Sequence, residues 1–245
     1  MNKVLAALSR KPFAVIGHRG ARGRAPENTL TALRYAISVG ADIAEFDVQR
    51  TRDGVLVASH DPVLRSREGV AINIRESLYE EVARVELPGG EHVPRIEEVI
   101  SEARGKIALF LEVKEPSDTR PLIELVEEHG ADDYVAVISF HEEAIAELKK
   151  IKPHIPGGLI YFKPPGLITQ CKKIGCEIVL PRYPLATPKA VSFAHRLGLK
   201  VVAWTVNDEK LFYEMHKRSV DGIATDYPDI GVRIRDSIAQ GKSIA

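Results

Sequence analysis

The feature of this sequence that most restricts its fold is a regular alternation of strand-like and helix-like segments. From Ile96 onward, short apolar runs are followed by segments in which apolar residues recur at helical spacing. Strands that are connected through helices pair in parallel. The chain has 245 residues, close to the roughly 250 of one (β/α)8 barrel. The sequence therefore predicts an α/β fold, a single TIM barrel over residues 1–245.

The strand count supports this prediction once one hairpin is recognised. Strand-like runs number nine, one more than a barrel needs. Only about five residues, 50–54, separate the strand that begins at Ile43 from the run Val55–Ser59. A parallel crossover needs a dozen or more residues, so these two runs must pair antiparallel, with Asp53-Gly54 as the turn. The barrel strands are then expected to begin near Phe13, Ile43, Ile107, Val135, Gly158, Glu177, Lys200 and Gly222.

A charged stretch without clear period, Val63–Pro94, follows the hairpin. It is long for a loop inside a barrel. We therefore expect residues 49–95 to form a small insertion, containing the hairpin, between the second and third barrel strands.

The second strand carries two carboxylates, Glu45 and Asp47, on the same face, because side chains alternate along a strand. Like charges about 4 Å apart repel by roughly 4 kcal/mol at an effective dielectric near 20. That is a large share of a total stability of about 5 to 15 kcal/mol. Something positive should therefore lie between them. The hairpin returns the chain beside this strand and delivers His60 and Asp61, either as part of a metal and acid–base site or as an ordinary charged edge.

Polar residues also end the neighbouring strands. The first strand ends in His18 and Arg19, and the third carries Glu112 and Lys114 at the same two-residue spacing. Because active sites of such barrels lie at the carboxyl ends of the strands, three carboxylates are expected to converge there. Ligation by oxygen alone favours Mg²⁺ or Ca²⁺ over zinc.

The alternative is a cluster of salt bridges in which Arg19 and Lys114 neutralise the acids without a metal. It would leave one net negative charge and two unexplained histidines, His18 and His60. Imidazole titrates near neutral pH, so this pair is suited to act as general acid and general base.

Six motifs in chain order resemble those of the glycerophosphodiester phosphodiesterase family. They are HRGARGRAPENT (18–29), EFDV (45–48), HDP (60–62), LEVK (111–114), WTVN (204–207) and GIATDYP (222–228). The resemblance covers nearly the whole chain. The sequence departs from the family at Arg65-Ser66-Arg67, where Arg-Thr-Thr is usual, which leaves the local shape of the insertion open.

The resemblance implies metal-dependent hydrolysis of glycerophosphodiesters to sn-glycerol 3-phosphate and an alcohol. It assigns Glu45, Asp47 and Glu112 as metal ligands, His18 and His60 as the acid–base pair, and Arg19 and Lys114 as phosphate-binding residues. In the family, the glycerol 2-hydroxyl is thought to attack phosphorus first. The cyclic phosphate that results is then opened by water.

Several residues are expected to position the side chains of this site without touching the substrate. Glu27 would orient Arg19, Asn28 would cap the following helix, and Asp61 would lie beside His60. Asp226 is expected to fix the last turn of the barrel rather than touch substrate.

Other residues could meet the substrate after later strands. Trp204 could form an apolar wall for the glycerol carbons, or it could simply pack at the barrel mouth. Lys163, Arg182 and Tyr183 follow the fifth and sixth strands and could contact the leaving group.

Composition limits the partners of the chain. Its 34 basic and 34 acidic residues give zero net charge, which indicates neither nucleic acid nor an acidic membrane as partner. The N-terminus has no signal-like apolar stretch, and no run of about 18 apolar residues offers a membrane anchor, so a soluble cytoplasmic protein is expected. Cys171 and Cys176 are expected to be buried thiols. The histidines outside the site are expected to be surface or capping residues without acid partners: His92, His129, His141, His154, His195 and His216.

Two other functions fit the same motifs. The site could act on a lysophospholipid or a phosphoinositide, or the chain could be an inactive phosphate-binding module. An inactive module is expected to lack one of the five central carboxylates and histidines, and all five are present. No oligomeric state follows from the sequence.

Overall fold

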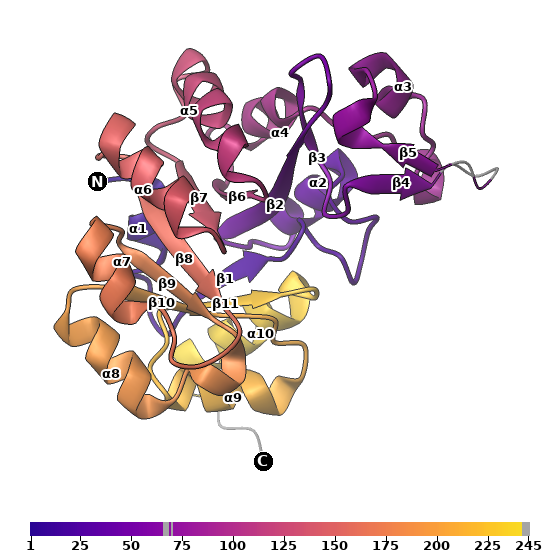
Figure 1. Cartoon of the computed structure of the whole chain (residues 1–245). Helices are drawn as coiled ribbons and strands as arrows, with labels where there is room; N and C mark the ends of the chain where they lie inside the picture. The colour runs from indigo at the N-terminus through magenta and orange to yellow at the C-terminus, as the bar shows by residue number, and fades with distance from the viewer. Residues whose placement is uncertain (66–68, 70, 242–245) are drawn as a thin grey trace.

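Eight parallel strands close into a barrel in the computed structural model, which describes residues 1–65, 69 and 71–241 (Figure 1). The strands are β1 (Ala14–Gly17), β2 (Ile43–Arg50), β6 (Ala108–Val113), β7 (Val135–Ser139), β8 (Gly157–Tyr161), β9 (Ile178–Pro181), β10 (Lys200–Ala203) and β11 (Gly222–Thr225). Each pairs in parallel with the next, and β1 pairs with both β2 and β11, which closes the ring. The predicted barrel is confirmed.

Helices cover the outside of this barrel (Figure 1). They are α2 (Leu30–Ser38), α4 (Ile96–Ala103), α5 (Thr119–Glu128), α6 (Glu142–Ile151), α7 (Ile168–Ile174), α8 (Pro188–Arg196), α9 (Glu209–Lys217) and α10 (Pro228–Ala239). The strand residues that point outward, such as Phe46 and Val48, pack against the buried faces of the helices. Together they form the largest hydrophobic cluster among the described residues. The cap of α2 differs from the prediction, because Thr29 rather than Asn28 accepts a hydrogen bond from the helix, at 3.2 Å from the Ala32 nitrogen.

A second cluster fills the barrel interior. Inward residues such as Ile43 and Phe110 contact Val4, in the short helix α1 (Lys3–Ala7), and Leu8, which follows it. Val4 and Leu8 are fully buried. A side chain on Gly222 would approach Leu8 to 2.9 Å, so glycine is needed where α1 reaches the strands. The amino-terminal end of the barrel is therefore filled.

The segment between β2 and β6 begins with the predicted hairpin. The strand β3 (Leu56–Ala58) pairs antiparallel with β2. A second ladder, absent from the sequence prediction, joins β4 (Val63–Arg65) to β5 (Ala71–Asn73), while Ser66 and Arg67 lie outside the described residues. Short turns and a helix complete the segment: η1 (Ile74–Glu76), α3 (Tyr79–Ala83) and η2 (Pro88–Gly90). These elements share a small core and lie together at one side of the barrel (Figure 1).

Two further short turns, η3 (Pro116–Asp118) and η4 (Tyr183–Leu185), follow β6 and β9. Within the described residues, no helix is long and apolar enough to cross a membrane.

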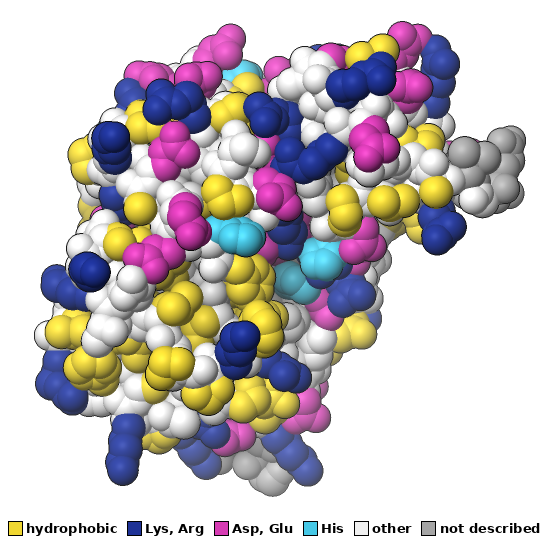
Figure 2. Space-filling model, in the orientation of Figure 1, with side chains coloured by type: hydrophobic (Ala, Val, Ile, Leu, Met, Phe, Trp, Pro, Cys, Tyr) yellow, Lys and Arg dark blue, Asp and Glu magenta, His cyan; other side chains and the backbone are white. Residues whose placement is uncertain are grey.

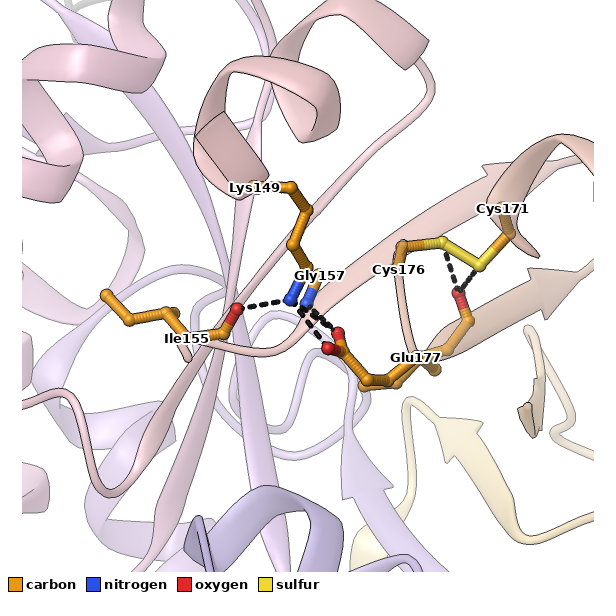
Figure 3. Close-up of a disulfide and its surroundings, with 7 residues drawn as sticks. Lys149, Ile155, Gly157, Cys171, Cys176 and Glu177 are labelled. Carbon is orange, nitrogen blue, oxygen red and sulfur yellow. Dashed lines mark hydrogen bonds and ion pairs between the residues drawn. A yellow bond between two sulfur atoms is a disulfide. The ribbon is translucent and has the colours of Figure 1, made fainter. Parts of the chain in front are cut away.

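The two cysteines form a disulfide rather than the predicted free thiols (Figure 3). Helix α7 ends in Gly175, whose φ of 80° turns the chain back at once. The Cα atoms of Cys171 and Cys176 are thereby brought within 5.0 Å, inside the range that a disulfide spans. The prediction was wrong because this turn is not visible in the spacing of two cysteines.

Candidate active site

Three buried carboxylates meet at the carboxyl ends of β2 and β6. Asp47 and Glu112 occupy paired positions on these two strands, and Glu45 lies on the same face of β2. One oxygen of each carboxylate lies within 4.8 Å of those of the other two. The predicted convergence of the three acids is confirmed.

The two predicted cations lie beside these acids. The Lys114 ammonium is 2.6 Å from Asp47 Oδ1 and 2.5 Å from Glu112 Oε1. Arg19 Nε is 3.4 Å from Asp47 Oδ2. Glu45 is less well compensated, since its Oε2 accepts only the Arg19 backbone N–H, at 2.8 Å, and its buried Oε1 has no hydrogen-bond partner.

The electrostatics of the cluster show how incompletely its charge is balanced. Burial raises the pKa of Glu45 well above its usual value, and the charges of Asp47 and Glu112 raise it further. Burial also raises the pKa of Glu112 to about 7. Burial acts in the same sense on Asp47, but Lys114 and the hydrogen bond from Asn28 outweigh it and hold the pKa of Asp47 below its usual value.

The donor set fits a hard divalent cation. It consists of oxygens only, one of them buried and unpartnered, and three carboxylates face two side-chain cations. A bound Mg²⁺ or Ca²⁺ would give the free Glu45 oxygen a partner and would offset the remaining negative charge. Glu45, Asp47 and Glu112 are therefore the residues that could hold such an ion.

Residues behind the cluster fix its geometry. Asn28 donates through Nδ2 to Asp47 Oδ2 at 2.8 Å and accepts from the Asp47 backbone N–H at 3.1 Å. It thus holds a carboxylate rather than capping a helix. Glu27 accepts a hydrogen bond from Arg19 Nη1 at 2.7 Å, which is the orienting contact that the sequence predicts.

His18 follows β1 directly, and its imidazole lines the pocket beside the carboxylates. Its Nδ1 lies 2.6 Å from Oδ1 of Asp226, a residue 208 positions away. Asn207 in turn donates to the other Asp226 oxygen at 2.7 Å and accepts from the Asp226 backbone N–H at 2.9 Å. Burial acts to raise the pKa of Asp226, but contact with His18 lowers it on balance. Sequence reasoning missed this role of Asp226.

His60 enters the same pocket from the loop after β3. Its Nδ1 lies 2.8 Å from Asp61 Oδ1, as expected for neighbours in the chain. The Ser59 backbone N–H donates to the Asp47 carbonyl at 3.1 Å, which ties this loop to β2. Figure 2 shows histidine side chains close together at the surface of this face of the molecule.

The rest of the pocket wall is apolar. Side chains from β1 and from β6 to β11, with the residues that follow β7 and β10, form it: Ile16, Phe110, Ile138, Phe140, Ile160, Leu180, Val202, Trp204 and Ala224. Trp204 is one of these, and its Nε1 donates to the Leu180 carbonyl at 2.6 Å. Its ring meets Phe140 edge-on at 5.7 Å between centroids. Phe140 was not singled out by the sequence, although it is the first residue after β7.

The residues expected to contact the leaving group do not line this pocket. The described residues that line the pocket do not include Lys163, Arg182 or Tyr183. The Lys163 ammonium lies 5.7 Å from the centre of the Phe162 ring, and the Tyr183 backbone N–H donates to the Trp204 carbonyl.

Two of the remaining histidines have acid partners, against the sequence prediction. His154 Nε2 lies 2.7 Å from Asp132, and His195 Nε2 lies 2.7 Å from Asp221. Both pairs join residues more than twenty positions apart, so only the folded chain brings them together.

Comparison with known proteins gives a consistent result. Residues 18–230 match the glycerophosphoryl diester phosphodiesterase family. A glycerophosphodiester phosphodiesterase of Bacillus altitudinis is 32% identical over 244 residues, which cover 91% of this chain and 98% of the relative. One from Caldanaerobacter subterraneus is 31% identical over 232 residues, covering 88% and 94%.

Solved structures of similar proteins have the same barrel fold. A phosphodiesterase of Oleispira antarctica, in complex with the product sn-glycerol-3-phosphate, has a TM-score of 0.85 and 28% identity and covers 91% of this chain and 97% of its own. A glycerophosphodiester phosphodiesterase of Parabacteroides distasonis has a TM-score of 0.84 at 28% identity, covering 94% and 99%. The chain is therefore an enzyme of the phosphoric diester hydrolase type, and it belongs to the glycerophosphoryl diester phosphodiesterase family.

Proposed function

We propose that this enzyme hydrolyses glycerophosphodiesters to sn-glycerol 3-phosphate and an alcohol, with a divalent cation and with His18 and His60 as acid–base pair. The observation that supports it most is the buried three-carboxylate cluster, with its unpartnered Glu45 oxygen, in one pocket with both histidines. The product named for the Oleispira antarctica structure is the one expected here.

Glu45, Asp47 and Glu112 would hold the cation. When bound, it would supply positive charge that offsets the charge developing on a phosphate oxygen during hydrolysis. Arg19 and Lys114 line the same pocket and would bind the phosphate of the substrate beside the three carboxylates.

We assign the general base to His18. A carboxylate accepts hydrogen bonds, so the contact with Asp226 places the proton on Nδ1 and leaves Nε2 able to take one. His18 would remove the proton of the glycerol 2-hydroxyl as that oxygen attacks phosphorus. An internal nucleophile of this kind is already positioned by the bound substrate.

His60 would act as the general acid. It is the more exposed of the two histidines, and it would give a proton to the departing alcohol. The cyclic phosphate that remains would then be opened by water, with the two histidines exchanging roles.

The test is release of sn-glycerol 3-phosphate from glycerophosphocholine, glycerophosphoethanolamine and glycerophosphoglycerol, assayed with Mg²⁺, with Ca²⁺ and with EDTA. We expect turnover with metal, loss with EDTA, and recovery when excess metal is restored. Activity that survives EDTA would remove the metal from the proposal, and absence of release from all three substrates would overturn the activity itself.

A second substrate comparison tests the cyclic intermediate. A diester whose 2-hydroxyl is replaced by hydrogen lacks the internal nucleophile, so we expect no measurable turnover. Hydrolysis of this analogue at the rate of its parent would show that water attacks phosphorus directly.

A further inference from the structure

The two histidines of the pocket are held in different ways. The His18 ring contacts the buried carboxylate of Asp226, which Asn207 fixes in turn. The His60 ring contacts Asp61, and the side chains of this second pair are 39% and 74% exposed. An exposed ion pair holds a ring only weakly. The direction in which the His60 ring points is therefore set mainly by the backbone of its own loop.

Two groups outside this loop bind its backbone carbonyls. The side-chain amide of Gln49, on β2, donates to the His60 carbonyl at 3.3 Å. The backbone N–H of Ile74, in η1, donates to the Pro62 carbonyl at 2.9 Å. Ile74 is fully buried in the small core of the segment between β2 and β6. The position of η1 therefore determines the path of the loop that carries His60.

Beside Ile74, η1 is joined to the barrel by a buried ion cluster. Asp118 ends η3, which follows β6, and its side chain is fully buried. Arg75, in η1, pairs with Asp118 Oδ2, and its Nη1 lies 3.5 Å from Oδ1. Arg50 ends β2, and its Nε lies 2.8 Å from the same Oδ1. We call Arg50, Arg75 and Asp118 the arginine clamp.

The burial of Asp118 makes the clamp stronger than an exposed ion pair. A carboxylate that has left water needs cations and hydrogen bonds in place of its hydration. The arginines divide this task, since Arg50 contacts Oδ1 and Arg75 is the closer partner of Oδ2. Arg75 is the member that belongs to η1, so its contact with Asp118 fixes η1 against the end of β6.

We propose that Arg75, held by Asp118, is a positioning residue for His60. The inference rests on the proposed function, because it takes His60 as the general acid. A misplacement of about 1 Å in a catalytic group can cost roughly 10²-fold in rate. Loss of the contact should therefore impair protonation of the departing alcohol. The three carboxylates and His18 lie on or directly after barrel strands, so metal binding and attack on phosphorus should be preserved.

The test compares two diesters that differ in their need for a general acid. Choline leaves glycerophosphocholine as a strongly basic alkoxide unless it is protonated, whereas p-nitrophenolate leaves the p-nitrophenyl ester of sn-glycerol 3-phosphate without a proton. In Arg75→Met, kcat should fall about tenfold or more with glycerophosphocholine and less than about threefold with the p-nitrophenyl ester. KM should stay close to the wild-type value with both. Equal slowing of the two diesters would overturn the inference.

The matched control is Arg50→Met. Each of the two substitutions takes one arginine from Asp118 and leaves it the other, so no buried charge is left unpaired. Because Arg50 is not part of η1, Arg50→Met should keep the wild-type kcat with both diesters. If the two variants slowed glycerophosphocholine hydrolysis equally, the clamp would act through stability alone and the inference would be wrong. If Arg75→Met does not fold, Arg75→Gln decides the question by the same comparison.

The His60→Ala background shows whether Arg75 acts through His60. Residues that work through one another have non-additive effects. Arg75→Met should therefore slow the His60→Ala enzyme by less than about twofold. The same loss in both backgrounds would contradict a positioning role.

The parent proteins separate this inference from the proposed function. No turnover of either diester by the wild-type enzyme would overturn the proposed function. A wild-type rate in His60→Ala would overturn the assignment of the general acid and this inference with it. Failure of the Arg75 comparisons alone leaves the proposed function intact.

Hydrogen exchange tests the same contact without turnover. The Ile74 amide proton is bound to the Pro62 carbonyl, so it exchanges when η1 opens. We expect exchange about tenfold faster in Arg75→Met than in the wild type, and wild-type exchange in Arg50→Met. Unchanged protection of the Ile74 amide in Arg75→Met would show that the clamp does not hold this loop.

Discussion

The Nδ1 atom of His18 lies 2.6 Å from Oδ1 of Asp226, and this contact joins the first barrel strand to the last. Asn207 fixes the carboxylate from the other side through two hydrogen bonds. The histidine that we assign as general base is therefore held in one orientation by a residue that does not line the pocket. Asp226 is a positioning residue in this arrangement.

Replacing Asp226 with Asn tests that role. We expect kcat to fall by roughly 10²-fold or more, because the wrong tautomer of His18 becomes accessible. KM should change less than kcat, because Asp226 does not line the pocket. Asp229→Asn is the control, because Asp229 lies nearby but pairs with Arg24 at the surface. If kcat and KM were impaired equally in Asp226→Asn, Asp226 would be limited to a structural role.

Replacing His60 with Ala removes the proposed general acid. Hydrolysis should slow by roughly 10² to 10⁴-fold, the usual contribution of one acid–base group. Substrates with good leaving groups should be slowed least, because they need little protonation. His154→Ala is matched, since His154 also contacts an aspartate but does not line the pocket. A wild-type rate in His60→Ala would exclude this residue from the mechanism.

Replacing Glu112 with Gln keeps the shape of a ligand and removes its charge. We expect loss of metal-dependent turnover with the fold retained, and at least a tenfold weaker affinity for Mg²⁺ or Ca²⁺ by calorimetry. Glu124→Gln, at an exposed position of α5, should bind the metal as wild type does. Unchanged affinity in Glu112→Gln would show that the ion is held elsewhere.

Glu112 should contribute less to the stability of the metal-free protein as pH rises from 4.5 to 7. Burial raises the pKa of Glu112 from 4.5 to about 7, so the folded state holds this proton more tightly than the unfolded state does. The stabilisation is complete below pH 4.5 and is lost as pH approaches 7, with a total on the order of 3 kcal/mol.

Urea unfolding across this pH range measures the effect. The same series on Glu112→Gln isolates it, because the amide does not titrate and the other groups of the protein are common to both. Equal pH dependence in the two proteins would contradict the raised pKa of Glu112. Saturating Mg²⁺ should restore the stability that the wild-type protein loses near neutral pH, because it binds the ionised carboxylates.

The sequence by itself determined the barrel and the carboxylate cluster. Strand and helix periods are local signals, and the two-residue spacing of Glu45 and Asp47 fixes their common face within one strand. Glu112 could be placed beside them because parallel strands end at the same edge of a barrel. Predictions of this kind need only the chain's own periodicity and one rule of topology.

Only the tertiary structure decided the contacts that depend on closure of the ring and on exact loop paths. Asp226 reaches His18 because β11 pairs with β1, and Asn28 turns to Asp47 instead of capping α2. The disulfide depends on the turn at Gly175, and the ring contacts of Phe140 with Phe162 and Trp204 depend on the paths of three separate loops. Such contacts join residues whose separation along the chain carries no periodic signal, so they are set by packing alone.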